Sequence, residues 1–150
     1  MTQLVTELGD SFMPVFEDAD KRLDVTAARG VALHGDAALL IQMLTNLLEN
    51  IIEHGRDGAR GWLVLSQDSD VVRIEVGDDG PGISEASRDD IFARFFRADT
   101  SRHTSGNGLG LSLVKAIVEL HAGTITLQAG MPGTVFEIIL AQPASDPAER

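Results

Sequence analysis

The residues best suited to chemistry form a polar stripe on one helix-like stretch, residues 36–54. At 100° per residue the stripe covers a band about 100° wide, opposite an apolar face. Its members are Gln42, Asn46, Glu49, Asn50 and Glu53. Carboxamide and carboxylate oxygens at this spacing can hold a hard cation such as Mg²⁺ or orient a nucleophile. A solvated helix face has the same pattern, so the rest of the chain decides between the two interpretations.

A second candidate site is the segment DDGPGI at residues 78–83, directly after a β-rich stretch. Two carboxylates end the predicted strand. Gly80 and Gly82 lack a Cβ atom, so a ligand can approach the backbone there. An ordinary turn has the same composition, and these residues are equally compatible with a binding loop and a plain turn.

A third candidate is the glycine-rich segment GNGLGL at residues 106–111, which opens a helical pattern. Unpaired backbone N–H groups at a helix N-terminus, together with the positive end of the helix dipole, favour phosphate. The segment lacks the Gly-Lys-Ser/Thr ending of the P-loop, and Leu113 replaces the last glycine of the dinucleotide fingerprint. If the segment binds phosphate, it therefore does so as neither of these two known loop types.

Apolar and basic residues alternate between the second and third segments. This Phe/Arg cluster consists of Ile91, Phe92, Arg94, Phe95, Phe96 and Arg97. We predict a short amphipathic helix that packs its phenylalanine rings into the core, because a chain this acidic is a poor platform for stacking nucleic-acid bases. The small, polar residues that follow, about ten in number, predict a mobile loop.

Two predicted elements precede the polar stripe. Residues 3–17 have apolar side chains at roughly helical spacing and predict a helix, although Gly9 and Pro14 interrupt the pattern. Residues 21–36 alternate apolar and polar side chains in two pieces around residues 29–30, which indicates a β-hairpin.

The helix that carries the polar stripe has its own start and end signals. Asp36 is a suitable N-cap. His54 places a side chain that can be a cation near the negative end of the dipole, and Gly55 is able to adopt a positive φ. The predicted core face consists of Leu40, Met43, Leu44, Leu47, Leu48 and Ile51.

Alternating segments later in the chain predict two pairs of strands. Residues 61–67 and 71–76 form a hairpin around the turn at 68–70, and residues 124–130 and 133–141 form the closing pair. The helix before the closing pair has a broad predicted core face. This face consists of Leu109, Leu113, Val114, Ile117, Val118 and Leu120. Attraction to the helix dipole explains His121 at its end.

Composition limits the function classes. At 150 residues the chain suits one domain, and a formal net charge of −11 argues against nucleic acid as a partner. The absence of cysteine excludes disulfides and fits a reducing cytoplasm. There is no signal-peptide pattern and no run near the ~18 apolar residues of a membrane span, although a longer parent protein could carry an inner-membrane anchor.

The order of the motifs is more distinctive than any one of them. NLLEN at 46–50, DDGPGI at 78–83, IFARFFR at 91–97 and GNGLGL at 106–111 follow one another between residues 22 and 141. In this order they resemble the catalytic and ATP-binding (HATPase, GHKL-type) domain of bacterial sensor histidine kinases. The wider group includes gyrase, mismatch-repair and heat-shock chaperone ATPases, but the Phe/Arg cluster and the helix after GNGLGL favour the kinases.

The resemblance implies an α+β fold, a two-layer α/β sandwich with a mixed, mostly antiparallel sheet and helices on one face. ATP would lie between the helices, under a flexible lid. Residues 22–141 would form the ATP-binding domain, residues 1–21 a helix or linker from a preceding dimerisation domain, and residues 142–150 a disordered tail.

The resemblance also implies roles for residues at the adenine end of the site. Asp78 resembles the carboxylate that accepts a hydrogen bond from the adenine amino group. Gly80 and Gly82 would let the backbone come close, and Thr134 stands where a strand threonine touches the adenine site.

At the phosphate end, Asn46 and Asn50 resemble the residues that hold Mg²⁺ and the phosphates, with Asn50 as the metal ligand. Glu49 resembles the base or orienting group for the attacking imidazole, and Arg97 an arginine that reaches the γ-phosphate. The residues that would flank the phosphates and hinge the lid are Gly106, Gly108, Leu109 and Gly110.

Two departures from the family pattern bear on activity. Where the family commonly has a lysine, this chain has Glu53. We expect either that the negative charge of Glu53 weakens ATP binding or that its side chain turns toward solvent. No segment resembles the phosphoacceptor helix. The acceptor histidine is therefore expected on a dimerisation domain elsewhere in the parent chain or its dimer mate, with a response regulator as an indirect partner. We expect the chain itself to be a monomer in the cytoplasm.

Two alternative functions remain open at this point. One is a protein serine kinase of the anti-sigma type, which is of similar size and acts on a hydroxyl group. The other is a degenerate nucleotide-binding or interaction module, suggested by Glu53 and by the missing acceptor helix.

Overall fold

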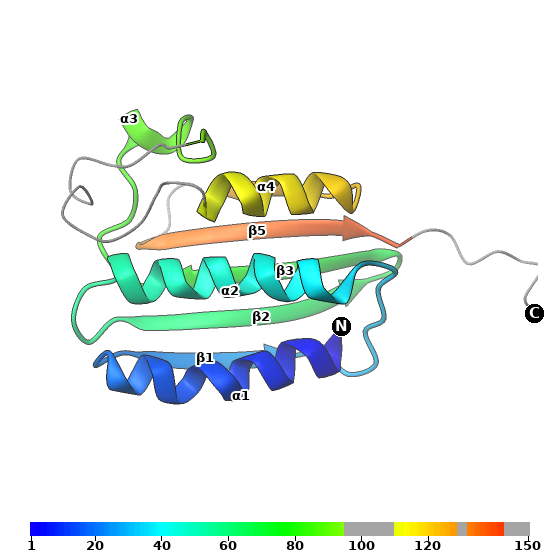
Figure 1. Cartoon of the computed structure of the whole chain (residues 1–150), viewed down its shortest axis with the longest axis horizontal. Coiled ribbons are helices and arrows are strands. Elements are labelled where there is room, and N and C mark those ends of the chain that lie inside the picture. The colour runs from blue at the N-terminus through cyan, green and yellow to red at the C-terminus, as the bar shows by residue number, and fades with distance from the viewer. Residues whose placement is uncertain (95–109, 129–131, 143–150) are drawn as a thin grey trace, which may run out of the picture.

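The computed structural model of the chain describes residues 1–94, 110–128 and 132–142. The elements in these ranges are α1 (Thr2–Asp18), β1 (Arg22–Ala27), α2 (Ala37–His54), β2 (Arg60–Asp68), β3 (Val71–Asp78), α3 (Glu85–Arg88), α4 (Gly110–Leu120), β4 (Thr124–Leu127) and β5 (Thr134–Ala141). Figure 1 shows two layers, a sheet with α1, α2 and α4 over one of its faces. In the described ranges, none of the helices has the length and apolarity needed to cross a bilayer.

The sheet has the strand order β1-β2-β3-β5-β4. β1 and β2 are parallel, and the other neighbouring strands are antiparallel. A parallel pair needs a long crossover connection, which α2 provides while it covers the same face as α1 and α4. The predicted α+β sandwich, with a mixed and mostly antiparallel sheet and helices on one face, is confirmed.

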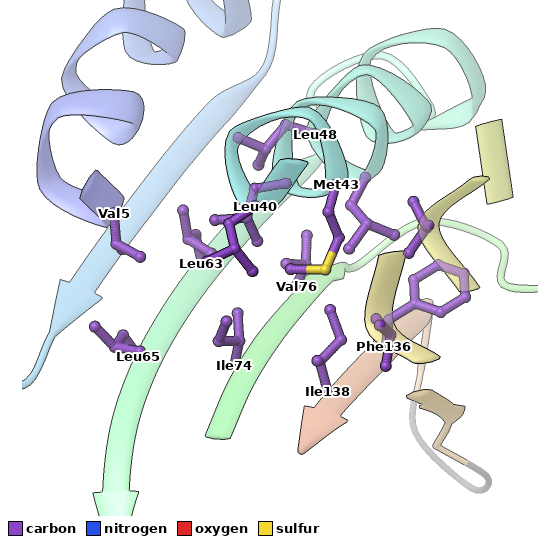
Figure 2. Close-up of a cluster of buried hydrophobic side chains, with 14 of the residues drawn as sticks. Val5, Leu40, Met43, Leu48, Leu63, Leu65, Ile74, Val76, Phe136 and Ile138 are labelled. Atoms are coloured by element: carbon purple, nitrogen blue, oxygen red, sulfur yellow. The ribbon is translucent and has the colours of Figure 1, made fainter. Parts of the chain in front are cut away.

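The core lies between the helices and the inward face of the sheet, as Figure 2 shows. All six residues of the predicted α2 core face are buried there. Each fully buried aliphatic or aromatic side chain contributes roughly 1.5–3 kcal/mol. Val5 and Phe16 of α1 are fully buried in the same core, so α1 is part of the folded unit that contains the sheet. Its origin in a dimerisation domain stays a prediction.

The hairpin predicted over residues 21–36 is wrong. Only β1 forms, and it pairs with the distant β2 instead of with residues 31–35. Val31 is buried, its carbonyl accepts from the Thr2 N–H at 3.2 Å, and its own N–H donates to the Thr2 hydroxyl at 2.9 Å. The alternation of apolar side chains therefore comes from packing beside α1 and not from strand pairing.

The ends of α2 follow the sequence signals in part. The Asp36 carboxylate accepts from the Leu39 N–H at 3.0 Å, which confirms the N-cap. Gly55 was expected to adopt a positive φ, but its φ is −67°. A Cβ atom at this position would lie 2.5 Å from the Ile51 carbonyl oxygen, so the glycine is required for close approach and not for a left-handed backbone.

The remaining elements largely match the sequence pattern. α1 is continuous through Pro14, and β2 with β3 forms the predicted hairpin, with Ser69 at φ 52° in its turn. β4 and β5 form the predicted antiparallel closing pair. The tail at 143–150 lies outside the described residues.

The Phe/Arg cluster does not form the predicted helix where it is described. The short helix α3 ends before it, and residues 91–94 are turns. The predicted packing is present, since Ile91 is buried and the Phe92 ring meets Phe136 edge-on at 6.1 Å between centroids. The other two phenylalanines, Arg97 and the predicted mobile loop lie outside the described residues.

α4 packs through a narrower face than predicted. Val114, Ile117 and Val118 are buried, whereas Leu113 is partly exposed and Leu120 is 71% exposed. Leu113 and Leu120 are seven residues apart and so share the outer side of the helix. The sequence cannot distinguish this side from the inner one, because both are apolar.

His121 bonds to a carbonyl of the last turn of α4, at the negative end of the helix dipole where it was predicted, and it also bonds to the start of α2. Its Nδ1 lies 2.8 Å from the Ile117 carbonyl oxygen, and its Nε2 accepts from the Asp36 N–H at 3.1 Å. In this arrangement Nδ1 donates to the carbonyl oxygen of α4 and Nε2 accepts from the backbone of α2. A Cβ atom at Gly35 would lie 2.7 Å from this ring, so that glycine makes room for it. The histidine thus joins the end of α4 to the start of α2.

Candidate functional site

The candidate site lies where β3 ends, β5 and α4 begin, and α2 ends, at the left of Figure 1. Side chains alternate between the two faces of a strand, and Val72, Ile74 and Val76 of β3 point into the core. Asp78 is the next position in this inward row. Its carboxylate is therefore directed into the helix layer, and the residue is only 7% exposed.

Asp78 is held by its own loop. Its Oδ1 accepts from the Gly80 N–H at 2.7 Å. Burial raises the pKa of the Asp78 carboxyl above its ordinary value; the Gly80 hydrogen bond opposes this, and the charge of Asp79 adds to it. A buried, oriented carboxylate is a strong acceptor for an N–H donor on a ligand.

Glycines make the loop around Asp78 possible. A Cβ atom on Gly80 would lie 2.6 Å from the Asp78 Oδ1, and one on Gly82, at φ +77°, would lie 2.8 Å from the Gly133 carbonyl oxygen. Gly133 has φ +82°, and its Cβ would overlap the Asp78 carbonyl at 1.8 Å. The segments 78–83 and 132–134 thus form one interlocked structure, which is more than a plain turn needs.

Thr134 lies directly beside Asp78. The two residues are register partners on β5 and β3, and each continues the inward row of its strand. Side chains of such partners have Cβ atoms about 4.5–5.5 Å apart. The structure therefore brings together the two side chains predicted to contact adenine, Asp78 and Thr134.

Asp79 anchors the loop on its other side. Its Oδ1 accepts from the Arg60 N–H at 2.9 Å, and its Oδ2 lies 3.5 Å from the Arg56 guanidinium. Both side chains of the ion pair are exposed, so its contribution to stability is small. Arg56 and Gly133 are parts of the site that were not predicted from the sequence. The glycine had a signal, its pairing with Gly130 at the strand connection, whereas only the fold brings Arg56 to Asp79.

The polar stripe of α2 divides between two sides of the helix. Asn50 is seven residues after Met43 and therefore lies on the side that faces α4. Glu49 and Glu53 line a hollow toward α1, and the Glu53 carboxylate is 3.8 Å from the His54 Nε2. Asn46 lies between the two sides and, like Asn50, is half-buried.

Other predicted site residues are only partly tested. Arg97, Gly106, Gly108 and Leu109 lie outside the described residues. Gly110 is the first residue of α4, and a Cβ atom there would meet nothing within 4 Å. Glycine is therefore not sterically required at position 110 by the described part of the chain.

Comparison with known proteins agrees with this geometry. The family model described as histidine kinase-, DNA gyrase B-, and HSP90-like ATPase matches residues 35–144. The sensor protein IrlS of Burkholderia pseudomallei is 41% identical over 116 residues, which are 75% of this chain and 24% of that protein. The probable sensor histidine kinase TcrY of Mycobacterium tuberculosis is 40% identical over 121 residues, 79% of this chain and 26% of that protein. The chain thus spans about a quarter of the length of these curated relatives.

Solved structures of histidine kinases have the same fold as this chain. The mycobacterial sensor histidine kinase MprB superposes with a TM-score of 0.83 and 29% identity, over 95% of this chain and 97% of that chain. The catalytic domain of the histidine kinase ThkA also superposes with a TM-score of 0.83, at 26% identity, over 95% of this chain and 92% of that chain. The chain belongs to the histidine kinase-, DNA gyrase B- and HSP90-like ATPase family and is a catalytic ATPase domain of the sensor histidine kinase type.

Proposed function

We propose that this domain binds Mg·ATP at the end of the sheet beside Asp78 and transfers the γ-phosphoryl group to a histidine on a separate dimerisation domain. The position of Asp78 is the observation that supports this most. It is a buried carboxylate in a core row, and within the described ranges it forms no salt bridge. A buried ionisable group without a charge partner is costly for folding and is more often found at functional sites.

The residues at the adenine end would select the base. Asp78 accepts a hydrogen bond from the adenine amino group, and Thr134 contacts the same ring from the neighbouring strand. Gly80 and Gly82 keep the loop free of side chains where the base enters. A guanine ring presents a carbonyl oxygen where adenine has its amino group, so the Asp78 carboxylate would disfavour it.

The residues at the phosphate end would position the metal and the phosphates. Mg²⁺ takes oxygen ligands and commonly completes its shell with substrate phosphates and water. Among the described residues, no group of three or more His, Asp or Glu side chains could hold a metal ion. Asn50, supported by Asn46, fits this need because a single carboxamide oxygen can complete the shell. When bound, Mg²⁺ would neutralise charge on the phosphates.

The transfer itself depends mainly on positioning. The acceptor histidine nitrogen forms a bond to the γ-phosphorus as the bond to the β–γ bridging oxygen breaks, and ADP leaves. Glu49 orients the imidazole and takes its proton. Its exposed position on α2 leaves it accessible to a histidine from another domain. Arg97 and the loop residues Gly106, Gly108, Leu109 and Gly110 are proposed to contact the phosphates.

A transfer assay tests the proposal. The chain is incubated with γ-labelled ATP and either the histidine-bearing dimerisation domain of a sensor histidine kinase or a hydroxyl-bearing protein of the kind phosphorylated by anti-sigma serine kinases. We expect an acid-labile product on the histidine domain only, as for a phosphoramidate. An acid-stable product on the hydroxyl protein would show a serine kinase. ATP binding without transfer to either acceptor would favour the degenerate module.

The proposed setting follows from the reaction. The domain would act in the cytoplasm, where ATP is available, within a longer sensor protein whose phosphohistidine supplies a response regulator. The response regulator and the longer sensor protein are proposed from the reaction, because the chain spans about a quarter of the length of its relatives.

A further inference from the structure

The segment that connects α2 to β2, residues 55–60, lies directly beside the loop that holds Asp78. It runs between the left ends of α2 and β2 in Figure 1, at the end of the sheet where β3 finishes. A Cβ atom on Gly80 would lie 3.9 Å from the backbone nitrogen of Arg56. The connecting segment therefore touches the residue whose N–H is bonded to the Asp78 carboxylate.

The connecting segment is itself fixed in place. Ala59 is fully buried, and its N–H donates to the Arg56 carbonyl oxygen at 3.0 Å. The Ala59 carbonyl oxygen accepts from the Arg22 N–H at 3.1 Å. The Gly58 N–H donates to the Asp20 carbonyl oxygen at 2.9 Å. Because these bonds tie the segment to the junction of α1 and β1, it is a firm support for a residue that bonds to it.

Asp79 joins the Asp78 loop to this support through two hydrogen bonds with Arg60. Its N–H donates to the Arg60 carbonyl oxygen at 3.1 Å, and its Oδ1 accepts from the Arg60 N–H at 2.9 Å. The first bond continues the pairing of β2 with β3 beyond Gly61 and Asp78, the final register partners of the two strands. The second bond needs a short side chain with an oxygen acceptor at position 79. We call these two bonds the Asp79–Arg60 clamp.

The direction of the chain at Asp79 affects the Asp78 carboxylate through the next residue. Gly80 follows Asp79 and donates its N–H to the Asp78 Oδ1 at 2.7 Å. Gly133 packs against the other side of Asp79, since a Cβ atom on Gly133 would lie 2.9 Å from the Asp79 Cα. Release of the Asp79–Arg60 clamp would therefore let the Gly80 N–H move away from the carboxylate that it holds.

We propose that Asp79 is a positioning residue for base selection. Through the Asp79–Arg60 clamp it fixes the Gly80 N–H, which orients the Asp78 carboxylate toward the adenine amino group. This inference rests on the proposed function, and it adds a residue that sets the specificity of the same site.

The charge of Asp79 has a role separate from its hydrogen bond. Burial is the main cause of the raised Asp78 pKa, the Gly80 hydrogen bond lowers this pKa, and the Asp79 charge raises it. The Arg56 guanidinium lies 3.5 Å from the Asp79 Oδ2, in an exposed ion pair. Asparagine at position 79 would keep an Oδ1 acceptor for the Arg60 N–H and remove the charge, so the two roles can be separated.

The preference for ATP over GTP tests the inference in variants matched at one position. Asp79→Ala removes the acceptor, and the ratio of the two affinities should fall by about threefold or more. Asp79→Asn keeps the acceptor and should keep most of the preference. Asp57→Ala, at an exposed aspartate of the connecting segment, should leave the ratio unchanged. Competition binding measures the ratio, and equal losses in Asp79→Ala and Asp79→Asn would overturn the inference.

NMR titration of the Asp78 carboxyl carbon tests the clamp without a nucleotide. Both substitutions at position 79 remove the same charge, so a difference between them reports the Gly80 hydrogen bond. Because that bond lowers the Asp78 pKa, the pKa should be higher in Asp79→Ala than in Asp79→Asn. Equal Asp78 pKa values in the two variants would overturn the inference. Melting curves of both variants show that the folded domain is being compared.

The two proposals fail in different ways. A wild-type chain that binds ATP no better than GTP would overturn the proposed function, and with it the role of Asp79 in base selection. A wild-type preference for ATP that Asp79→Ala retains in full would overturn the role of Asp79 alone.

Discussion

α2 has a helix on each side, and the two contacts are built differently. Toward α4, Val114 and Val118 are fully buried, and His121 joins the end of α4 to the first turn of α2. Toward α1, the surfaces separate into hollows and leave Val15 and Ile41 exposed. α2 is therefore held more firmly from the α4 side than from the α1 side.

The polar stripe follows the same division. Asn50 lies toward α4 and Glu49 toward α1, because consecutive helical residues differ by 100° in direction. The two groups also differ in burial, because Glu49 is exposed and Asn50 is half-buried.

The largest effect is expected from the α4 side of the stripe. Asn50→Ala removes the proposed metal ligand, so Mg-dependent ATP binding should fall below detection in isothermal titration calorimetry. Gln42→Ala, an exposed member of the same stripe, should keep the wild-type affinity. Wild-type affinity of the Asn50 variant for Mg·ATP would refute its assigned role.

The difference in packing between the two sides of α2 can be measured through the free energy of unfolding. Met43→Ala, on the closed side, removes a fully buried side chain and should lower the free energy of unfolding by about 2–5 kcal/mol. Val15→Ala, beside the hollow between α1 and α2, should change the free energy of unfolding by less than about 0.5 kcal/mol. Urea denaturation of both variants checks this. Similar losses would mean that the α1–α2 contact is as important for stability as the α2–α4 contact.

Base selection is expected to depend on Asp78. Asp78→Asn keeps the shape of the side chain but presents an amide in place of the carboxylate. The preference for ATP over GTP should fall by roughly tenfold or more, as for loss of a hydrogen bond to a charged group. Competition binding with the two nucleotides measures the ratio, and an unchanged ratio would exclude the adenine contact.

The same substitution should raise stability, with a defined dependence on pH. Because the folded-state pKa of Asp78 is raised, ionisation of this carboxyl opposes folding. The penalty is absent below the ordinary carboxyl pKa of 3.8 and complete above the raised value. Asp78→Asn should therefore be more stable than the wild type at neutral pH, and the difference should disappear near pH 3.8. Equal stability at neutral pH would contradict the raised pKa.

The smallest effect is expected from the joint between α4 and α2. His121→Ala removes two hydrogen bonds and should cost about 1 kcal/mol of stability. His34→Ala, at an exposed histidine near the same end of α2, should cost less. Thermal unfolding of the pair compares them, and equal melting temperatures would show that the joint contributes nothing.

Features governed by neighbouring residues could be predicted from the sequence. The α2 core face and its Asp36 cap depend on helical spacing and on one local hydrogen bond. The end of a strand at Asp78 and the loop at Gly80 depend on turn-forming residues within the same segment. The motif order then allowed the family to be predicted, as the comparisons confirm.

The predictions from the sequence that were wrong concern contacts between segments that are distant along the chain. Residues 31–35 alternate like a strand, but β1 finds its partner in β2, more than thirty residues away along the chain. Leu113 and Leu120 are as apolar as Val114, yet only Val114 is fully buried. In each case the local pattern is the same for two outcomes, and packing selects one.

For this protein, the sequence alone determined which residues share the polar stripe and which segments are rich in glycine, because helical period and backbone freedom are short-range properties. The tertiary structure decided how those residues are used. It placed Asp78 in the core beside Thr134, locked Gly133 against the same loop, and left Glu49 beside a hollow next to α1. These outcomes depend on which surfaces meet across the fold, and spacing along the chain carries no information about that.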